Sequence, residues 1–178
     1  MEEETKKLLF IILTIFVLTT TYGCGNKTET DKAKETVDNF FAALKDADFK
    51  KAADFVLSEE QEQMRNTQWE DDFEREFMET YLSKISLKYL SGEIEKDNTE
   101  GSLMYKFKSI DMGDFISKVG LNNPTIEGGA PKIKDVDVDG MHMVELEKSV
   151  FLKKEGDKWL IANVDDIMNA IMEFKAGE

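Results

Sequence analysis

The chain has 178 residues and a formal net charge of −14, because 37 acidic side chains outnumber 23 lysines and arginines. A domain this acidic gains nothing from counterion release and is repelled by phosphates, so we expect no nucleic-acid partner. It is also repelled by anionic lipid headgroups, so attachment to a membrane would require an anchor. The single cysteine, Cys24, has no partner for an intramolecular disulfide.

The first 23 residues have the pattern of a secretory signal peptide. Lys6 and Lys7 precede an apolar run over residues 8–18. This run is shorter than the ~20 residues that cross a bilayer, but it fits the ~7–15 apolar residues of a signal core. Gly23 supplies the small residue expected before the cleaved bond. We therefore predict that residues 1–23 are removed and that Cys24 becomes the new N-terminus.

The segment Thr21-Tyr22-Gly23-Cys24 resembles the lipobox of bacterial lipoproteins. That resemblance implies that the Cys24 thiol receives diacylglycerol and that the protein lies on the extracytoplasmic face of the cell membrane. Two acyl chains give durable anchoring, whereas a single chain binds only marginally. The alternative is an uncleaved or ordinary secreted form with a free thiol.

Helical patterns dominate the first half of the mature chain. Residues 24–30 are small, polar and charged, as in a short tether, and apolar spacing over 31–44 predicts a helix that begins at Asp31. Asp48 is expected to cap a second helical segment. Ser58 begins a capping-box sequence, which predicts one further helix running to about Leu82.

Aromatic residues recur at every fourth position of this last predicted helix, at Trp69, Phe73, Phe77 and Tyr81. Such a stripe belongs either to the core or to a ligand site, and Phe73, Phe77 and Tyr81 are our candidates for ligand binding. Nine acidic residues against two arginines also lie between Glu59 and Glu79. They indicate either a solvated face or a face that attracts cations or a basic partner.

The later half of the chain has the alternating pattern of strands. Apolar residues alternate over 85–89 and 103–107, with turn residues at Asp97-Asn98, so we predict two antiparallel strands. Asp111 is placed to cap a short helix. A loop rich in glycine and proline follows over 120–140.

A second hairpin and a final helix complete the predicted elements. A long strand over 144–152 contains Lys148, which interrupts the apolar rhythm as a bulge or an edge charge does. The turn Glu155-Gly156-Asp157 leads to a returning strand over 158–164, and a last helix begins at Asp165. We thus predict one α+β domain over residues 31–178, with N-terminal helices packed on an antiparallel sheet and an added C-terminal helix.

Two stretches resemble the nuclear-transport-factor-like (cystatin-like) α+β superfamily: ETVDNFFAALKDADFKKAADFV over 35–56 and FLKKEGDKWLIANV over 151–164. The resemblance implies a long helix lying across a curved antiparallel sheet, with a cone-shaped cavity between them. Some members of the superfamily are dehydratases or isomerases that use an aspartate or a histidine inside the cone.

We find no catalytic constellation in the residues themselves. Residues 135–140 (DVDVDG) are similar to the start of a calcium loop, but Leu146 occupies the position of its bidentate glutamate. His142 lies between two methionines and is the only histidine. We expect no cofactor. The predicted function is that of a membrane-anchored lipoprotein whose acidic domain binds a small ligand or an envelope protein without catalysis. The alternatives are a small enzyme using the cone and a structural lipoprotein.

Overall fold

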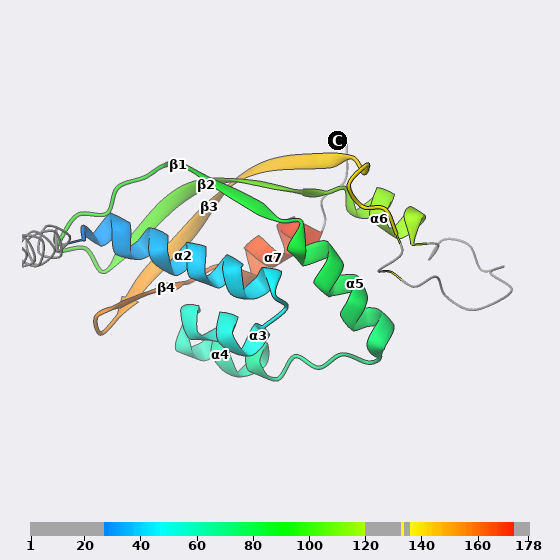
Figure 1. Ribbon diagram of the computed structural model, residues 1–178. Helices are drawn as coiled ribbons and strands as arrows, with labels where there is room; N and C mark the ends of the chain where they lie inside the picture. The colour runs from blue at the N-terminus through cyan, green and yellow to red at the C-terminus, as the bar shows by residue number, and fades with distance from the viewer. Residues whose placement is uncertain (1–26, 120–132, 134–135, 173–178) are drawn as a thin grey trace, which may run out of the picture.

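The computed structural model describes residues 27–119, 133 and 136–172 (Figure 1). The described part contains six α-helices and a four-stranded antiparallel sheet, with a helix after the last strand. This confirms the predicted α+β class and the added C-terminal helix. The predicted signal peptide, Gly23 and Cys24, and most of the loop over 120–140 lie outside the described residues.

The first described helix, α2 (Glu29–Lys45), crosses one face of the sheet (Figure 1). Thr28 is its N-cap, and its hydroxyl accepts a hydrogen bond of 3.1 Å from the Asp31 N–H. Asp31 returns the contact by accepting from the Thr28 N–H at 3.2 Å. This capping box starts the helix at Glu29. The prediction of a start at Asp31, with Glu29 in a tether, is therefore wrong by two residues.

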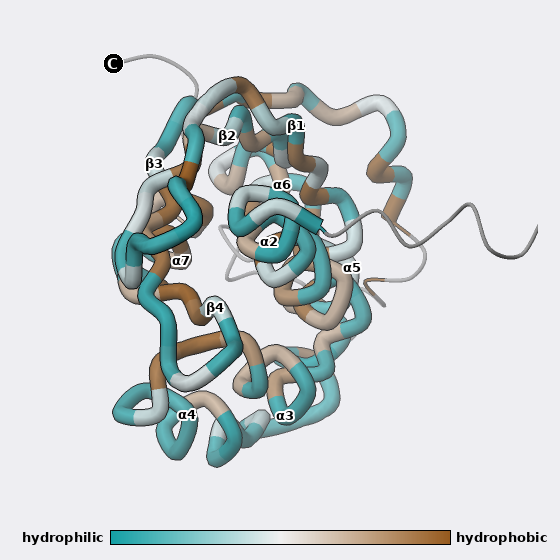
Figure 2. Tube along the Cα trace, turned by 90° about the vertical axis from the view of Figure 1, so that its left-hand side faces the viewer, coloured by the Kyte–Doolittle hydropathy of each residue, from teal (hydrophilic) through white to brown (hydrophobic). Residues whose placement is uncertain are grey.

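Short helices follow α2 along the chain and lie below it in Figure 1. Asp48 caps α3 (Phe49–Ala52) as predicted, by accepting from the Lys51 N–H at 3.0 Å. A 3-10 turn, η1 (Ala53–Phe55), follows and leads to α4 (Ser58–Arg65). Figure 2 shows that α4 is mostly hydrophilic, in keeping with its lack of fully buried residues.

The single helix predicted from Ser58 to Leu82 is two helices. After α4 ends at Arg65, α5 begins again at Asp72 and runs to Ser83, with Asp71 as its N-cap. The Asp71 carboxylate accepts from the Glu74 N–H at 2.8 Å, which satisfies a free donor of the first turn. The capping box at Ser58 is also absent, because Leu57 is the N-cap and the Ser58 hydroxyl donates to Glu155 instead.

The sheet has the order β1-β2-β3-β4, with β1 at Ser86–Ser91, β2 at Glu100–Ile110, β3 at Met143–Glu155 and β4 at Lys158–Ile161. Strands β2 and β3 pair without interruption from Glu100↔Lys153 to Ile110↔Met143, so Lys148 is not a bulge. It is an exposed residue of the sheet edge, because β4 ends before reaching it. Strand β4 ends at Ile161, three residues before the end predicted for the returning strand at residue 164.

Two more helices flank the sheet. Asp111 caps α6 (Met112–Lys118) as predicted, and α7 (Val164–Met172) follows β4 directly. None of the helices in the described ranges is long and apolar enough to cross a membrane.

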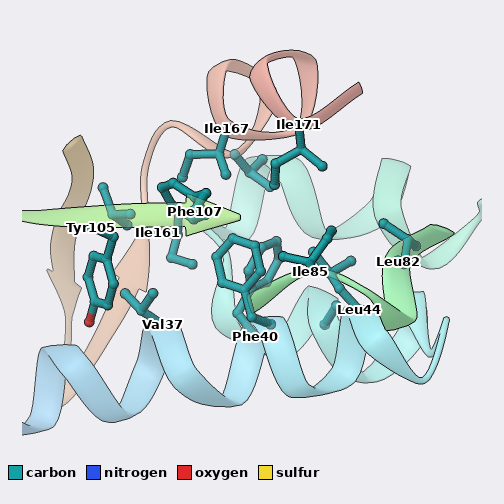
Figure 3. Close-up of a cluster of buried hydrophobic side chains, with 14 of the residues drawn as sticks. Val37, Phe40, Leu44, Leu82, Ile85, Tyr105, Phe107, Ile161, Ile167 and Ile171 are labelled. Carbon is teal, nitrogen blue, oxygen red and sulfur yellow. The ribbon is translucent and has the colours of Figure 1, made fainter. Parts of the chain in front are cut away.

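Apolar side chains fill the space between α2, the sheet and α7. In Figure 3, Val37, Phe40 and Leu44 of α2 point toward Phe107 and toward Ile167 and Ile171 of α7. The aromatic residues of this core include Phe40, Phe41 and Trp159, which are all buried. The interior that the family resemblance would make a cone-shaped cavity is thus occupied by packed core.

Candidate functional site

The predicted aromatic stripe is divided by the break between α4 and α5. Trp69 lies in the connection and packs edge-on against Phe49, with ring centroids 5.3 Å apart. Phe73 and Phe77 remain neighbours on α5, at 6.4 Å. Phe77 packs on Phe115 of α6 at 4.7 Å. The aromatic residues of the stripe therefore pack against two different partners, Phe49 and Phe115, and do not form one continuous surface.

Tyr81, the last member of the stripe, lies completely inside the core. Its hydroxyl donates a hydrogen bond of 2.6 Å to the Ile171 carbonyl oxygen of α7. Burial raises the pKa of the Tyr81 phenol. The structure thus brings Phe73, Phe77 and Tyr81 together and gives them packing contacts, and their role in ligand binding stays a prediction.

The acidic segment considered for calcium is used for local contacts where it is described. The Asp139 carboxylate pairs with Lys84 at 2.9 Å, and this hydrogen bond lowers its pKa. Asp137 accepts from the Asp139 N–H at 3.1 Å. Asp135 lies outside the described residues, and the described residues contain no group of three or more His, Cys, Asp or Glu able to hold a metal ion.

A different feature, the free edge of β3, is the best candidate site. Only the last part of β3, Leu152–Glu155, is paired with β4. Asn163 extends the pairing with its side chain: its Oδ1 accepts from the Phe151 N–H at 2.9 Å. Its Nδ2 donates to the Ser149 carbonyl oxygen at 3.0 Å. The Asn163 amide thus takes the place of the next residue of a strand.

Beyond Asn163, the edge of β3 over residues 143–148 is paired with no strand in the described part of the chain. Alternate residues of a strand direct their N–H and C=O groups to the same edge. Because Phe151 bonds on the β4 side, Glu145 and Glu147 direct their backbone groups to this open edge. Such a row of free donors and acceptors is a template for another strand.

An open groove of about 700 Å³ runs between this edge and α7. Polar side chains from both elements predominate in its lining, together with Phe151, which is 50% exposed and supplies apolar surface. The charges are mixed, with Glu147 3.6 Å from Lys106 on the neighbouring strand. The lining residues are Met104, Glu147, Lys148, Ser149, Phe151, Asn163, Asp166, Asn169 and Ala170.

Sequence reasoning missed this groove, although one signal was present. The residues predicted for the second hairpin already suggested a longer first strand, and a long strand paired with a shorter one leaves a free edge. The pattern of apolar residues did not predict that α7 lies beside that edge. It also did not predict the two hydrogen bonds between the Asn163 side chain and β3.

Comparison with known proteins assigns no family to the chain. No protein-family model matches it, and no curated protein matches it either. The function is therefore inferred from the groove and from the N-terminal sequence.

Proposed function

We propose that the protein is a lipid-anchored binding protein of the extracytoplasmic face of a bacterial membrane, and that its groove takes up an extended segment of a partner protein. The observation that carries this proposal is the unpaired edge of β3 beside an open groove. Binding by strand addition needs no catalytic group. The anchor rests on the lipobox-like sequence before Cys24.

Strand addition matches the chemistry of this edge. Main-chain hydrogen bonds to an added strand give affinity, and the pockets beside the edge give specificity. Glu145 and Glu147 offer the free N–H and C=O groups, while Asn163 closes the edge at Ser149. The added strand would therefore run along residues 143–149, a length of roughly 23 Å at ~3.3 Å per residue.

A second copy of the chain is a poor occupant of the edge in the registers centred on residues 145–148. Antiparallel self-pairing centred on Glu145, Glu147 or Lys148 places that residue opposite its own copy, and pairing centred on Leu146 places Glu145 opposite Glu147. Like charges directly opposite each other destabilise paired strands. A partner with lysine or arginine near Glu147 and Asp166 has complementary charge instead.

An anchor on Cys24 would lie near the hairpin end of the sheet, whereas the free edge of β3 begins at the opposite end. Cys24 is four residues before the N-cap Thr28, a span of at most ~14 Å. The first turn of α2 contacts the β3–β4 hairpin through Lys154 and Trp159. Met143, at the start of the free edge, pairs with Ile110 at the far end of the sheet. A lipid on Cys24 would thus hold the hairpin near the bilayer and leave the start of the free edge, at Met143, pointing away from it.

The test uses the full chain in detergent and an array of peptides of about ten residues, the length of a long strand. Bound peptides should slow hydrogen exchange at the amides of Glu145 and Glu147. Glu147→Pro removes one edge N–H and should abolish binding, whereas Glu147→Gln keeps the backbone and should weaken only basic peptides. Binding that survives Glu147→Pro, without protection of these amides, would contradict strand addition.

A further inference from the structure

We propose that a small pocket between α4 and α7 binds a compact organic cation, meaning an ammonium or guanidinium group with small apolar substituents. The pocket has a volume of about 120 Å³ and is separate from the β3 groove. It uses Asp165 and Met168 of α7, whereas the groove uses Asp166 and Asn169 of the same helix. The proposal does not depend on the proposed strand addition.

Two carboxylates supply the negative charge of this pocket. The Oε2 atom of Glu60 is buried and has no hydrogen-bond partner among the described residues. Asp165, which is exposed, lines the same pocket. Arg65, the basic residue of α4, is paired with Asp54 instead. A carboxylate oxygen that is buried without a partner is unfavourable, so a cation that reaches the partly exposed Glu60 side chain supplies a missing contact.

The ionisation behaviour of Glu60 agrees with this geometry. Burial raises the pKa of the Glu60 carboxyl, and the neighbouring charges of Asp165 and Glu59 raise it further. Negative charge is thus in excess at this position. A bound cation would lower that excess.

Apolar groups form the rest of the wall. Phe49 lines the pocket with Met64 and Met168, and Trp69 supports the Phe49 ring from its side. Aromatic faces attract organic cations, and methionine side chains adapt to ligands of irregular shape. Carboxylates together with apolar walls suit an alkylated cation better than a fully hydrated ion.

Size narrows the class of ligand. The pocket volume of about 120 Å³ is small beside the ~300–1,000 Å³ of typical ligand pockets, so a compact cation such as propylammonium, guanidinium or tetramethylammonium suits it. Calcium requires six to eight oxygen ligands, and the described residues offer no cluster of three or more metal-binding side chains.

The experiment titrates the full chain in detergent with propylammonium, guanidinium and tetramethylammonium chloride, and follows binding by calorimetry. Sodium chloride at equal ionic strength and 1-propanol are the controls for screening and for apolar contact. A further titration uses Nα-acetyl-lysine amide. It tests whether the pocket takes the side chain of a lysine residue as well as a free amine. We expect saturable binding of at least one cation and none of either control.

Matched variants locate the site. Glu60→Gln should weaken binding at least about tenfold, whereas Glu62→Gln, an exposed residue of the same helix, should leave it unchanged. Met168→Lys places an ammonium group at the pocket wall, so it should abolish binding while raising the melting temperature. Equal responses to sodium and to the organic cations, or full affinity in both Glu60→Gln and Met168→Lys, would overturn the proposal.

Discussion

The indole Nε1 of Trp159 donates a hydrogen bond of 2.9 Å to the Glu29 carboxylate, which joins the first turn of α2 to β4. The same carboxylate accepts from Lys154 at 2.8 Å and from Lys32 at 2.6 Å. Glu29 is only 9% exposed. Glu29, which was predicted to lie in the tether, is thus bonded to the sheet, and these bonds fix the first turn of α2 to the rest of the domain.

This arrangement predicts a dependence of stability on acid. The hydrogen bonds from Lys154, Lys32 and Trp159 lower the pKa of Glu29 from 4.5 to about 2. A lowered pKa in the folded state stabilises the fold above pH 4.5, and this contribution is lost as the pH falls from 4.5 toward 2. Denaturation of Glu29→Gln should therefore show a deficit at neutral pH that shrinks over this window. Glu35→Gln, on the same helix but exposed, is the control.

Trp159→Ala should cost about 3–5 kcal/mol of unfolding free energy, because a buried ring and its hydrogen bond are both removed. Chemical denaturation measures this cost. Trp159→Phe keeps most of the packing and removes only the donor, so it should cost less. A loss below ~1 kcal/mol in Trp159→Ala would contradict the packing of the hairpin on α2.

Asn163→Ala should lower stability by about 1–2 kcal/mol, because the Phe151 N–H and the Ser149 carbonyl lose their partner and only water replaces it. Hydrogen exchange at the Phe151 amide should accelerate in the same variant. Asn169→Ala, an exposed position of α7, should change stability by less than ~0.5 kcal/mol. Equal effects of the two substitutions would remove the special role of Asn163 at the strand edge.

Cys24→Ser should release the protein from the membrane fraction and block lipid addition, because the thiol is the predicted acceptor of diacylglycerol. Intact-mass analysis of the parent protein should show loss of residues 1–23 and gain of the lipid. If the variant remains as firmly membrane-bound as the parent and keeps residues 1–23, an uncleaved anchor replaces the lipoprotein interpretation.

Local patterns in the sequence were sufficient for much of the fold. The buried face of α2 follows from apolar spacing, and the caps at Asp48 and Asp111 follow from short-range hydrogen bonds. The turn at Gly156 is likewise local, since its φ of 61° favours glycine. These features depend on residues a few positions apart, which a linear pattern contains.

The break between α4 and α5 shows where such patterns fail. Aromatic residues continue at helical spacing across it, yet Asp71 starts a new helix and Trp69 packs against Phe49 instead. A spacing of four residues shows which side chains are apolar, but it does not show which partner each side chain contacts. Contacts between distant segments, such as that of Trp69 with Phe49, accompany the break between the two helices.

The N-terminal signal is a linear feature, so the anchor at Cys24 could be predicted from the residues alone. The acidity of the domain and the class of its fold could be predicted in the same way. The candidate sites, in contrast, are formed by residues that meet only in the folded domain. Asn163 and Ser149 meet because β4 turns back along β3, and Glu60 and Asp165 share a pocket because α7 packs near α4. Contacts between residues far apart in the chain depend on the packing of whole elements, which no local spacing records.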